Sequence, residues 1–358
     1  MTSVRLERKV GLAGAVFLMV GNVVGASIFI LPGTLAGIAG PAIFIAYLIA
    51  IIPAFFNTLV AAQVGSILPV SAADYVFTST VLHPLLGFLK VWAAMLGALV
   101  GGPILAYGFA DYFAFFAPDI NRVTLACLIV VSIMIINLLG IRSSVKIQMV
   151  MVSLFVSALL ILAIGGLFYI DGELLTPIAP LGWGAVLAAA VPAYYSYTGF
   201  TMLLSITEEI KNPAKNVPLI TLYTFLIVAF IYTSVTFVVP GLIHWQELGT
   251  IVAPLSAAAA TFLPEWYSTA ITIAALLAAG TSINMIIITA SRSFFAVARN
   301  RIYPQIFNRV SRHTGEPDTT VILVGVIILA GIGLQGNIAQ YASVSVIGWM
   351  LYGIIWGI

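Results

Sequence analysis

Charged side chains are scarce in this chain: 14 Lys and Arg and 12 Asp and Glu make up only 7% of its 358 residues. A water-soluble protein of this length needs a charged surface, and so few charges cannot cover one. Hydrophobic residues reach 62%. The composition therefore excludes an ordinary soluble protein and indicates that most of the surface faces lipid.

Cysteine, histidine and catalytic motifs are also nearly absent. The single cysteine, Cys127, excludes a disulfide framework within the chain. His83, His244 and His313 lie far apart in the sequence, and neither G-x-S-x-G nor H-E-x-x-H occurs. We therefore expect no enzyme and no resident cofactor. A net charge of +2 spread along the chain gives no indication of nucleic-acid binding.

Ten long apolar runs are present instead. A bilayer core of roughly 30 Å needs about 20 helical residues per crossing, whereas a β-barrel would show short segments of alternating polarity. The polar stretch 290–319 is expected outside the membrane beside anionic headgroups, and 241–265 is expected to include a short interfacial helix. We predict an all-α integral membrane protein whose ten transmembrane helices lie at 10–31, 41–66, 85–113, 123–139, 149–170, 183–206, 218–240, 266–288, 320–334 and 338–358.

The basic residues set the orientation. If the N-terminus lies in the cytoplasm, 13 of the 14 Lys and Arg residues fall on the cytoplasmic side, and only Arg122 falls outside. We therefore predict a protein of a prokaryotic cytoplasmic membrane with a cytoplasmic N-terminus. A cleaved signal peptide over residues 1–27 is the alternative. Its removal would leave nine spans, the first of which would enter the membrane from the wrong side.

Two of the ten runs contain helix-weakening residues at mid-depth. The first reads GNVVGASIFILPG at 21–33, and the sixth reads VPAYYSYTGFT at 191–201, with Pro192 and Gly199. Because five is odd, the second set of five helices enters from the opposite side, which permits an inverted repeat. We expect helices 1 and 6 to be broken, in repeats at about 5–170 and about 180–358. A GxxxG packing face is the alternative for GNVVG.

Broken helices have free backbone groups that lipid cannot satisfy. The amides at the N-terminus of one half-helix suit a carboxylate, and the carbonyls at the C-terminus of the other suit an ammonium group or an alkali cation. Two antiparallel broken helices side by side therefore suit a zwitterion such as an amino acid.

Four motifs resemble, in order and spacing, those of the amino acid–polyamine–organocation transporter superfamily: GNVVGASIF with LPG, LPVSAADYVF, YSYTGFT with TEEIKNPAKNVP, and SRSFFAVARNRIYPQIF. The resemblance runs from about residue 8 to the end of the chain. It implies the five-plus-five inverted-repeat fold of the bacterial leucine transporter. Family members usually have two further helices, which this sequence is expected to lack.

The resemblance also implies the site residues. Amides at Ala26 and Ser27 would hold the substrate carboxylate, carbonyls at Val23 and at 195–198 would hold its amino group, and a tyrosine at 194, 195 or 197 would be a gate. The family usually has Gly in place of Ser27, often Glu in place of Thr201, and in some proton-coupled members Lys in place of Phe155. The implied substrate site consists of Val23, Gly25, Ala26, Ser27, Ala106, Tyr194, Tyr195, Ser196, Tyr197, Thr198, Gly199, Thr201, Asn284 and Ile286.

A cation site is implied beside it. The residues that resemble the second sodium site of the leucine-transporter fold are Gly21, Val24, Ala278, Thr281 and Ser282, of which the last three share one helix face. Ile28 stands where the other sodium site needs Asn, so at most one Na⁺ is expected. The alternative is that the hydroxyl groups bond back to their own helix. Sodium coupling, proton coupling and exchange stay open, because the predicted spans have no proton carrier at mid-membrane depth.

These features predict a secondary active transporter that moves amino acids by alternating access, with helices 1, 2, 6 and 7 rocking against the others. Neutral amino acids are favoured, because no intramembrane carboxylate is available to pair a cationic side chain. The alternatives are an exchanger of polyamines or other organic cations with the same fold, and a channel or structural membrane protein. The expected partners are the small substrate and the lipid bilayer, with no oligomeric state predicted.

Overall fold

The structure, a computed structural model, describes residues 6–356 except 115, 118, 198, 252, 312, 336 and 337, and it leaves aside the side chains of 30, 195, 338–340, 342, 343, 346 and 356. Nearly all described residues lie in helices, and none of them lies in a β-strand. The predicted all-α class is therefore confirmed. Thr198 and the side chain of Tyr195, both predicted in the substrate site, lie outside the described residues.

The helices follow the predicted order of apolar runs, and the segment 241–265 contains two short helices. In chain order they are α1 (Leu12–Val24), α2 (Ser27–Ala39), α3 (Ile43–Ile67), α4 (Ala73–Val81), α5 (Pro84–Phe113), α6 (Arg122–Leu138), α7 (Ile141–Gly166), α8 (Trp183–Ser196), η2 (Phe200–Met202), α9 (Leu203–Ile206), η3 (Thr207–Glu209), α10 (Pro213–Val238), α11 (Trp245–Leu248), α12 (Pro254–Ala260), α13 (Glu265–Arg299), α14 (Asp318–Gly333) and α15 (Ile338–Trp356).

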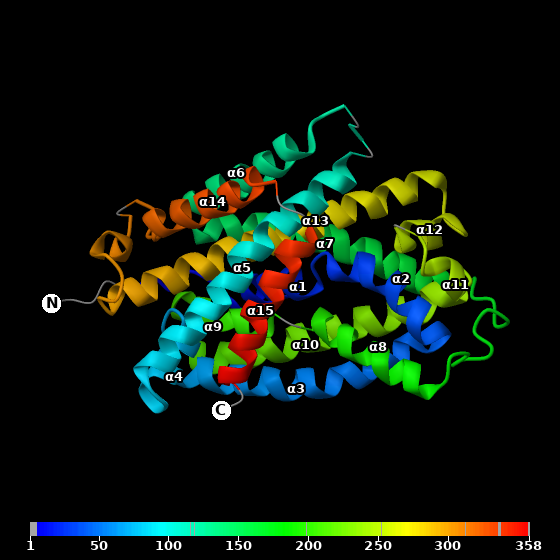
Figure 1. The fold of residues 1–358 in the computed structure, drawn as a ribbon, viewed down its shortest axis with the longest axis horizontal. Coiled ribbons are helices and arrows are strands. Elements are labelled where there is room, and N and C mark those ends of the chain that lie inside the picture. Colours follow the sequence, from blue (N-terminus) through cyan, green and yellow to red (C-terminus); the bar gives the residue numbers. More distant parts are fainter. Residues whose placement is uncertain are drawn as a thin grey trace.

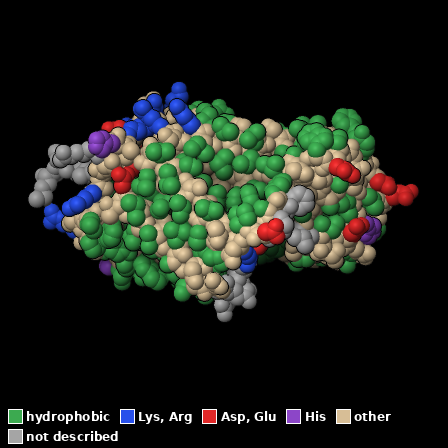
Figure 2. Space-filling model, turned by 90° about the horizontal axis from the view of Figure 1, so that it is seen from above, with side chains coloured by type: hydrophobic (Ala, Val, Ile, Leu, Met, Phe, Trp, Pro, Cys, Tyr) green, Lys and Arg blue, Asp and Glu red, His purple; other side chains and the backbone are tan. Residues whose placement is uncertain are grey.

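The surface fits an integral membrane protein. Large apolar side chains stay exposed, such as Phe56 at 62% and Val191 at 75%. Figure 2 shows hydrophobic side chains over the middle of the molecule, with Lys and Arg gathered mainly at one end. Within the described part of the chain, the helical stretches long and apolar enough to cross a membrane are Leu31–Ile67, Pro84–Phe113, Ile141–Gly166, Pro213–Gly241 and Glu265–Arg299, and shorter apolar helices accompany them.

Three helices extend well beyond the predicted runs, and one of them is α2, which continues to Ala39 although the first run was predicted to end at 31. α7 begins at Ile141 instead of 149, and α13 continues to Arg299 instead of ending at 288. The extensions hold polar side chains, such as Ser144 and Arg292, that are almost fully buried against other helices. A search for apolar runs misses them, although buried polar groups with hydrogen-bond partners are compatible with a helix interior. Residues 290–299 of this polar stretch therefore belong to α13, beyond the predicted end of the apolar run at 288.

The first and sixth predicted helices are interrupted. α1 ends at Val24, Gly25 adopts φ 41° and ψ −152°, and α2 begins at Ser27. α8 ends at Ser196, and Gly199 adopts φ 113° before η2 begins. A positive φ strains any residue that has a Cβ. A glycine at each point therefore lets the chain leave the helical path without that strain.

α13 is the central helix. In an apolar stretch of 18 residues of α13, 89% of the residues are buried. The helix contacts α1, α5, α7 and α14. Figure 1 shows α1 and α2 roughly in line beside α13, with α3, α8 and α10 on one side and α6 and α14 on the other. The interruption between α1 and α2 therefore lies inside the helix assembly.

Candidate functional site

A cavity of about 630 Å³ lies at the two interruptions. The stretch from Asn22 to Ser27 lines one side, residues between Tyr194 and Met202 line another, and α3, α5, α13 and α15 complete the wall. Among the described residues that line it, none is Asp, Glu, Lys, Arg or His. Small-molecule sites typically have about 300–1,000 Å³, so the cavity has room for a small uncharged or zwitterionic compound.

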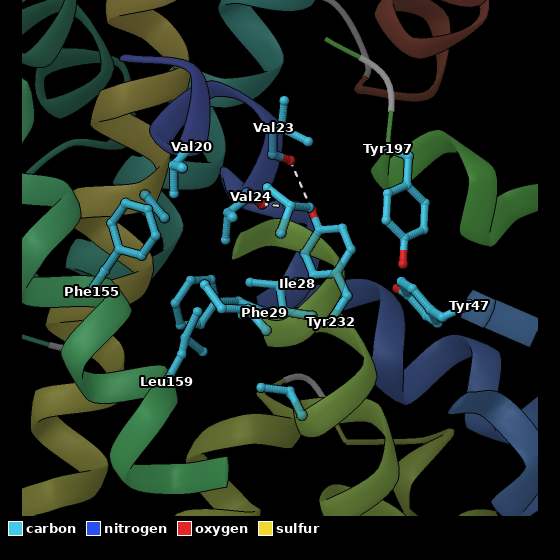
Figure 3. Packing of buried hydrophobic residues seen from close by; sticks show 14 of the residues in the cluster. Val20, Val23, Val24, Ile28, Phe29, Tyr47, Phe155, Leu159, Tyr197 and Tyr232 are labelled. Carbon is cyan, nitrogen blue, oxygen red and sulfur yellow. Dashed lines mark hydrogen bonds between the residues drawn. The ribbon is translucent and has the colours of Figure 1, made fainter. Parts of the chain in front are cut away.

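The hydroxyl group of Tyr232 on α10 joins the two interruptions. Its oxygen lies 2.7 Å from the carbonyl oxygen of Val23 and 3.0 Å from that of Ser196. The Val24 carbonyl oxygen at 3.3 Å and the Ser27 hydroxyl at 3.1 Å complete its surroundings. Figure 3 shows the Tyr232 ring beside Val23 and Val24. One O–H donates to only one acceptor at a time, so this point is rich in acceptors and would stabilise a further donor such as an ammonium group.

Two more neutral side chains satisfy backbone carbonyls here. The Asn22 amide nitrogen donates to the Gly199 carbonyl oxygen at 3.2 Å, which gives a second link between the interruptions. The Ser27 hydroxyl donates to the Val24 carbonyl oxygen at 3.1 Å. Such partners are required where a helix is interrupted inside a membrane. The sequence analysis did not predict Asn22 or Tyr232 as residues of the site. The signal that could have indicated them is a polar side chain within an apolar run.

The N-terminal end of α2 lies at the same cavity. This helix of 13 residues begins at Ser27, and the amides of a first helical turn have no acceptor within the helix. Ala26 and Ser27 both line the cavity. Because a helix N-terminus has about half a positive elementary charge, an anionic group is stabilised at this end of the cavity.

Three tyrosines pack together beside these groups. The ring centroids of Tyr47, Tyr197 and Tyr232 lie 5.1 to 6.1 Å apart in edge-to-face arrangements, as Figure 3 shows. Tyr197 lines the cavity, and its buried hydroxyl has no hydrogen-bond partner among the described residues. An unpartnered buried hydroxyl is destabilising, so this group is suited to bind a ligand. Tyr194 also lines the cavity, and its hydroxyl accepts a hydrogen bond from Asn57 at 2.8 Å.

Oxygen atoms of the predicted cation site lie close together. The Thr281 hydroxyl oxygen is 2.9 Å from the carbonyl oxygen of Gly21 and 2.7 Å from that of Ala278. The Ser282 hydroxyl donates to the Ala278 carbonyl oxygen at 3.2 Å. Carbonyl and hydroxyl oxygens are ligands that hard cations prefer, so the chemistry of the set fits Na⁺. The bonds to Ala278 also show that both hydroxyls bond back to their own helix.

Of the predicted substrate-site residues whose side chains the structure describes, three do not line the cavity: Ala106, Asn284 and Ser196, whose carbonyl oxygen contacts the hydroxyl group of Tyr232. Ala106 is buried among apolar side chains of α6 and α14, and the Asn284 side chain hydrogen-bonds with polar side chains of α6 and α7. The cavity wall instead includes Gly101 on α5 and, as predicted, Ile286 on α13. Residues two positions apart on a helix point to different faces, so Asn284 and Ile286 do not share one environment.

A charged cluster follows the second interruption along the chain. We use this name for Glu208, Glu209, Arg292, Arg299 and Glu316. Arg292 pairs with Glu209 at 2.7 Å and with Glu316 at 2.6 Å, and all three side chains are almost fully buried. Arg299 pairs with Glu208 at 2.9 Å. Burial raises the pKa of Glu209, and the guanidinium group of Arg292 opposes that shift.

The segment before α1 is joined to this cluster through the backbone. The Val10 amide donates to the Glu209 carbonyl oxygen, and the Lys211 amide donates to the Val10 carbonyl oxygen, both at 2.9 Å. The Leu6 amide donates to a carboxylate oxygen of Glu208 at 3.4 Å. The chain that leads into the first interrupted helix is therefore fixed to the chain that leaves the second one.

Comparison with known proteins gives relatives along almost the whole chain. A family model described as "Amino acid permease" matches residues 10–358. The branched-chain amino acid permease BcaP of Bacillus subtilis (strain 168) is 27% identical over 85% of this chain and 70% of its own length. The vacuolar cationic amino acid transporter 4 of Arabidopsis thaliana is 26% identical over 97% of this chain and 62% of its own. The chain thus spans about two thirds of the length of these relatives.

A solved structure shows the same fold. It is a Na⁺-coupled sialic acid symporter in a substrate-bound outward-open state, with a TM-score of 0.70 and 16% sequence identity. The similarity covers 97% of this chain and 78% of that one. This likeness confirms the transporter fold that the sequence motifs implied. The methylthioribose transporter of Bacillus subtilis, 26% identical over 94% of this chain, shows that relatives differ in the compounds they are named for.

Proposed function

The chain belongs to the amino acid permease family, and we propose that it moves neutral amino acids across a membrane by alternating access. The observation that carries this proposal is the cavity at the two interruptions: the first residues of α2 and Val23, whose carbonyl oxygen accepts from Tyr232, line it, and none of its described lining residues is charged. A zwitterion has one group for each end. A solute with only one charge would leave one end without a partner.

The substrate carboxylate is placed at the amides of Ala26 and Ser27, next to Gly25, where the N-terminus of α2 favours an anion. We assign the ammonium group to the carbonyl oxygens of Val23 and Ser196, which both lie within hydrogen-bond distance of the Tyr232 hydroxyl. The Tyr197 hydroxyl, unpartnered among the described residues, contacts the bound substrate. Of the other predicted residues, Tyr194, Gly199, Thr201 and Ile286 also line the cavity.

The preference for neutral amino acids rests on the lining. A Lys or Arg side chain of a substrate would need a carboxylate partner away from water, and the described lining residues include no Asp or Glu. The alternative, an exchanger of polyamines or cationic amino acids, is supported by the cationic amino acid transporter among the relatives. The name of the other relative, a branched-chain amino acid permease, favours neutral substrates.

Alternating access requires the interrupted helices to move against the others. We propose that the two sets of five predicted helices form an inverted repeat, that the first, second, sixth and seventh helices move, and that the N-terminus is cytoplasmic in a prokaryotic membrane. Energy comes from a cation gradient or from exchange of one substrate for another. Na⁺ is the candidate cation, because Gly21, Val24, Ala278, Thr281 and Ser282 offer oxygen ligands where α1 and α13 meet.

Purified protein in proteoliposomes tests the proposal. A panel of radiolabelled amino acids would be offered outside the vesicles under a sodium gradient or under a proton gradient. In a third condition, counterflow, no ion gradient is applied and the vesicles are loaded with unlabelled substrate. We expect saturable counterflow of one or more neutral amino acids and weak counterflow of lysine, arginine and putrescine. Counterflow of putrescine or arginine alone would establish the alternative. Absence of counterflow for every compound, from protein that is correctly inserted, would contradict transport of this class.

A further inference from the structure

A buried relay of side-chain amides ends at the candidate cation site. Asn137 on α6, Ser144 and Gln148 on α7 and Asn284 on α13 are each 3% exposed or less. The Asn137 amide donates to the Asn284 carbonyl oxygen at 2.8 Å, and the Asn284 amide donates to the Gln148 carbonyl oxygen at 2.9 Å. The relay lies outside the cavity wall, so substrate contact does not explain it.

The direction of the relay is fixed at its start. Asn137 also donates to the backbone carbonyl oxygen of Ile133 at 2.9 Å, and a carbonyl can only accept. The Asn137 amide nitrogen therefore serves both Ile133 and Asn284, and the Ser144 hydroxyl adds a second donor to the same Asn284 oxygen at 3.0 Å. Because this oxygen is committed as an acceptor, Asn284 must present its N–H groups to Gln148.

Gln148 consequently presents N–H groups at the other end. Its carbonyl oxygen is occupied by Asn284, and its amide nitrogen lies 3.5 Å from the carbonyl oxygen of Thr281. The same nitrogen is so close to Gly21 that a Cβ on that residue would overlap it. Thr281 and Gly21 both belong to the candidate cation site. A hydrogen-bond donor therefore lies beside two residues of that site, and the Thr281 oxygen that it approaches is the backbone carbonyl, whereas the site uses the Thr281 hydroxyl.

We propose that Gln148 is a resident donor that weakens Na⁺ binding at this site, and that the relay from Asn137 holds it in that orientation. An N–H group has a partial positive charge, so it repels a cation that binds next to it. This inference rests on the proposed transport function, because it concerns the driving ion of the same cycle. It assigns Gln148 as a positioning residue that favours exchange over sodium-driven uptake.

Three variants separate this role from a structural one. Gln148→Met removes the donor at similar volume, and Gln148→Glu replaces it with an acceptor. Ser144→Ala is the matched control, because it removes one hydrogen bond of the relay while Asn137 still donates to Asn284. The readout is the thermal unfolding midpoint of the full chain in detergent, titrated with NaCl against choline chloride at constant ionic strength, so that no transport is needed.

We expect the sodium concentration for half-maximal stabilisation to fall at least about tenfold in Gln148→Glu and by a smaller factor in Gln148→Met. Ser144→Ala should lower the midpoint in both salts and leave the sodium dependence as in the wild type. The inference is overturned if all four proteins respond to sodium equally, or if none responds. Amino acid counterflow without sodium is measured in parallel, since its absence would count against the proposed function and not against Gln148.

Discussion

The cavity and the charged cluster both bury polar groups in an apolar molecule, but they do so with different partners. In the cavity wall, neutral groups contact backbone carbonyls, as Asn22 does at Gly199. In the cluster, the Arg292 guanidinium lies between the carboxylates of Glu209 and Glu316. A hydrogen bond between neutral groups makes a net contribution of only about 0.5–1.5 kcal/mol to the stability of the fold. A ligand can therefore replace it. Breaking a buried ion pair leaves an uncompensated charge, which is far more costly.

This difference assigns the two regions different roles. The cavity can exchange its partners, which binding and release require. The cluster joins α13 to η3, and the backbone bonds at Val10 join η3 to the segment before α1. If either interrupted helix moves away from α13 at this end, the movement must break these ion pairs or these backbone hydrogen bonds. We expect mutations in the cluster to act on stability and closure, and mutations in the cavity to act on affinity.

The largest effect is expected for Arg292→Leu. It leaves the carboxylates of Glu209 and Glu316 buried without their guanidinium partner, and loss of one partner of a buried ion pair typically destabilises by about 3–5 kcal/mol. The measurement is the thermal midpoint in detergent, followed by size-exclusion chromatography. Arg292→Lys keeps the charge but loses the two-point geometry, so it should be intermediate. A wild-type midpoint in Arg292→Leu would contradict the role given to the cluster.

The same variant should become less unstable in acid. Burial already raises the pKa of Glu209 while Arg292 opposes the shift, so removal of Arg292 raises that pKa further. A group that binds a proton more tightly in the folded state than in the unfolded state gains stability as the pH falls. The difference in thermal midpoint between Arg292→Leu and the wild type should therefore shrink from pH 8 to pH 5. A constant difference would show that Glu209 keeps another charged partner.

The next effect concerns the cavity and Gly25. Its φ of 41° strains any other residue, and a Cβ would overlap the Ser282 hydroxyl. We expect Gly25→Leu to reduce substrate affinity at least about 100-fold, equal to about 2.7 kcal/mol, while the protein still inserts. Binding of a labelled amino acid to detergent-solubilised protein measures this. Gly108→Leu is the control, because a Cβ there meets nothing within 4 Å. Unchanged affinity in Gly25→Leu would make this glycine a packing residue only.

Sequence predicted the cavity better than the cluster, for a physical reason. Glycines that permit positive φ stand out within apolar runs, and Gly25 and Gly199 both adopt a positive φ in the structure. Arg292 lies in a stretch that looks like a polar surface segment, because a sequence does not show that carboxylates from two distant segments surround it. Charge alone does not distinguish a solvated arginine from a buried one.

The details of the cavity wall were also beyond the sequence. Tyr232 lies in a run where aromatic residues usually pack, and only the approach of α10 to both interruptions makes its hydroxyl a bridge. Asn284 was predicted at the substrate, but the rotation of α13 turns it to the amide relay. Such assignments depend on which helix face meets which neighbour, and this is set by packing of the whole assembly.

A pair of tyrosine variants tests the surroundings of the cavity, and the expected effect is of intermediate size. Tyr232→Phe removes a donor that contacts carbonyls of both interruptions, so stability without substrate should fall by about 1–3 kcal/mol. Tyr197→Phe removes a buried hydroxyl that has no partner among the described residues, so the thermal midpoint without substrate should stay the same or rise. Substrate should stabilise Tyr197→Phe less than the wild type. If both variants lose stability equally without substrate, the Tyr197 hydroxyl has a partner within the protein. That result would contradict its proposed contact with the substrate.

The smallest effect is expected at the edge of the cluster, for Arg299→Gln. Arg299 is 17% exposed, and its partner Glu208 also accepts hydrogen bonds from the backbone amide and hydroxyl of Ser71. Because Glu208 keeps its hydrogen bonds to Ser71 when Arg299 is replaced, we expect a smaller loss than for Arg292→Leu, and salt should weaken the pair through the exposed part of Arg299. The thermal midpoint should fall slightly in low salt, and the difference should diminish in 0.5 M NaCl. A fall in the thermal midpoint as large as that of Arg292→Leu would mean that the charged cluster is one cooperative unit, in which Arg299 contributes as much to stability as Arg292.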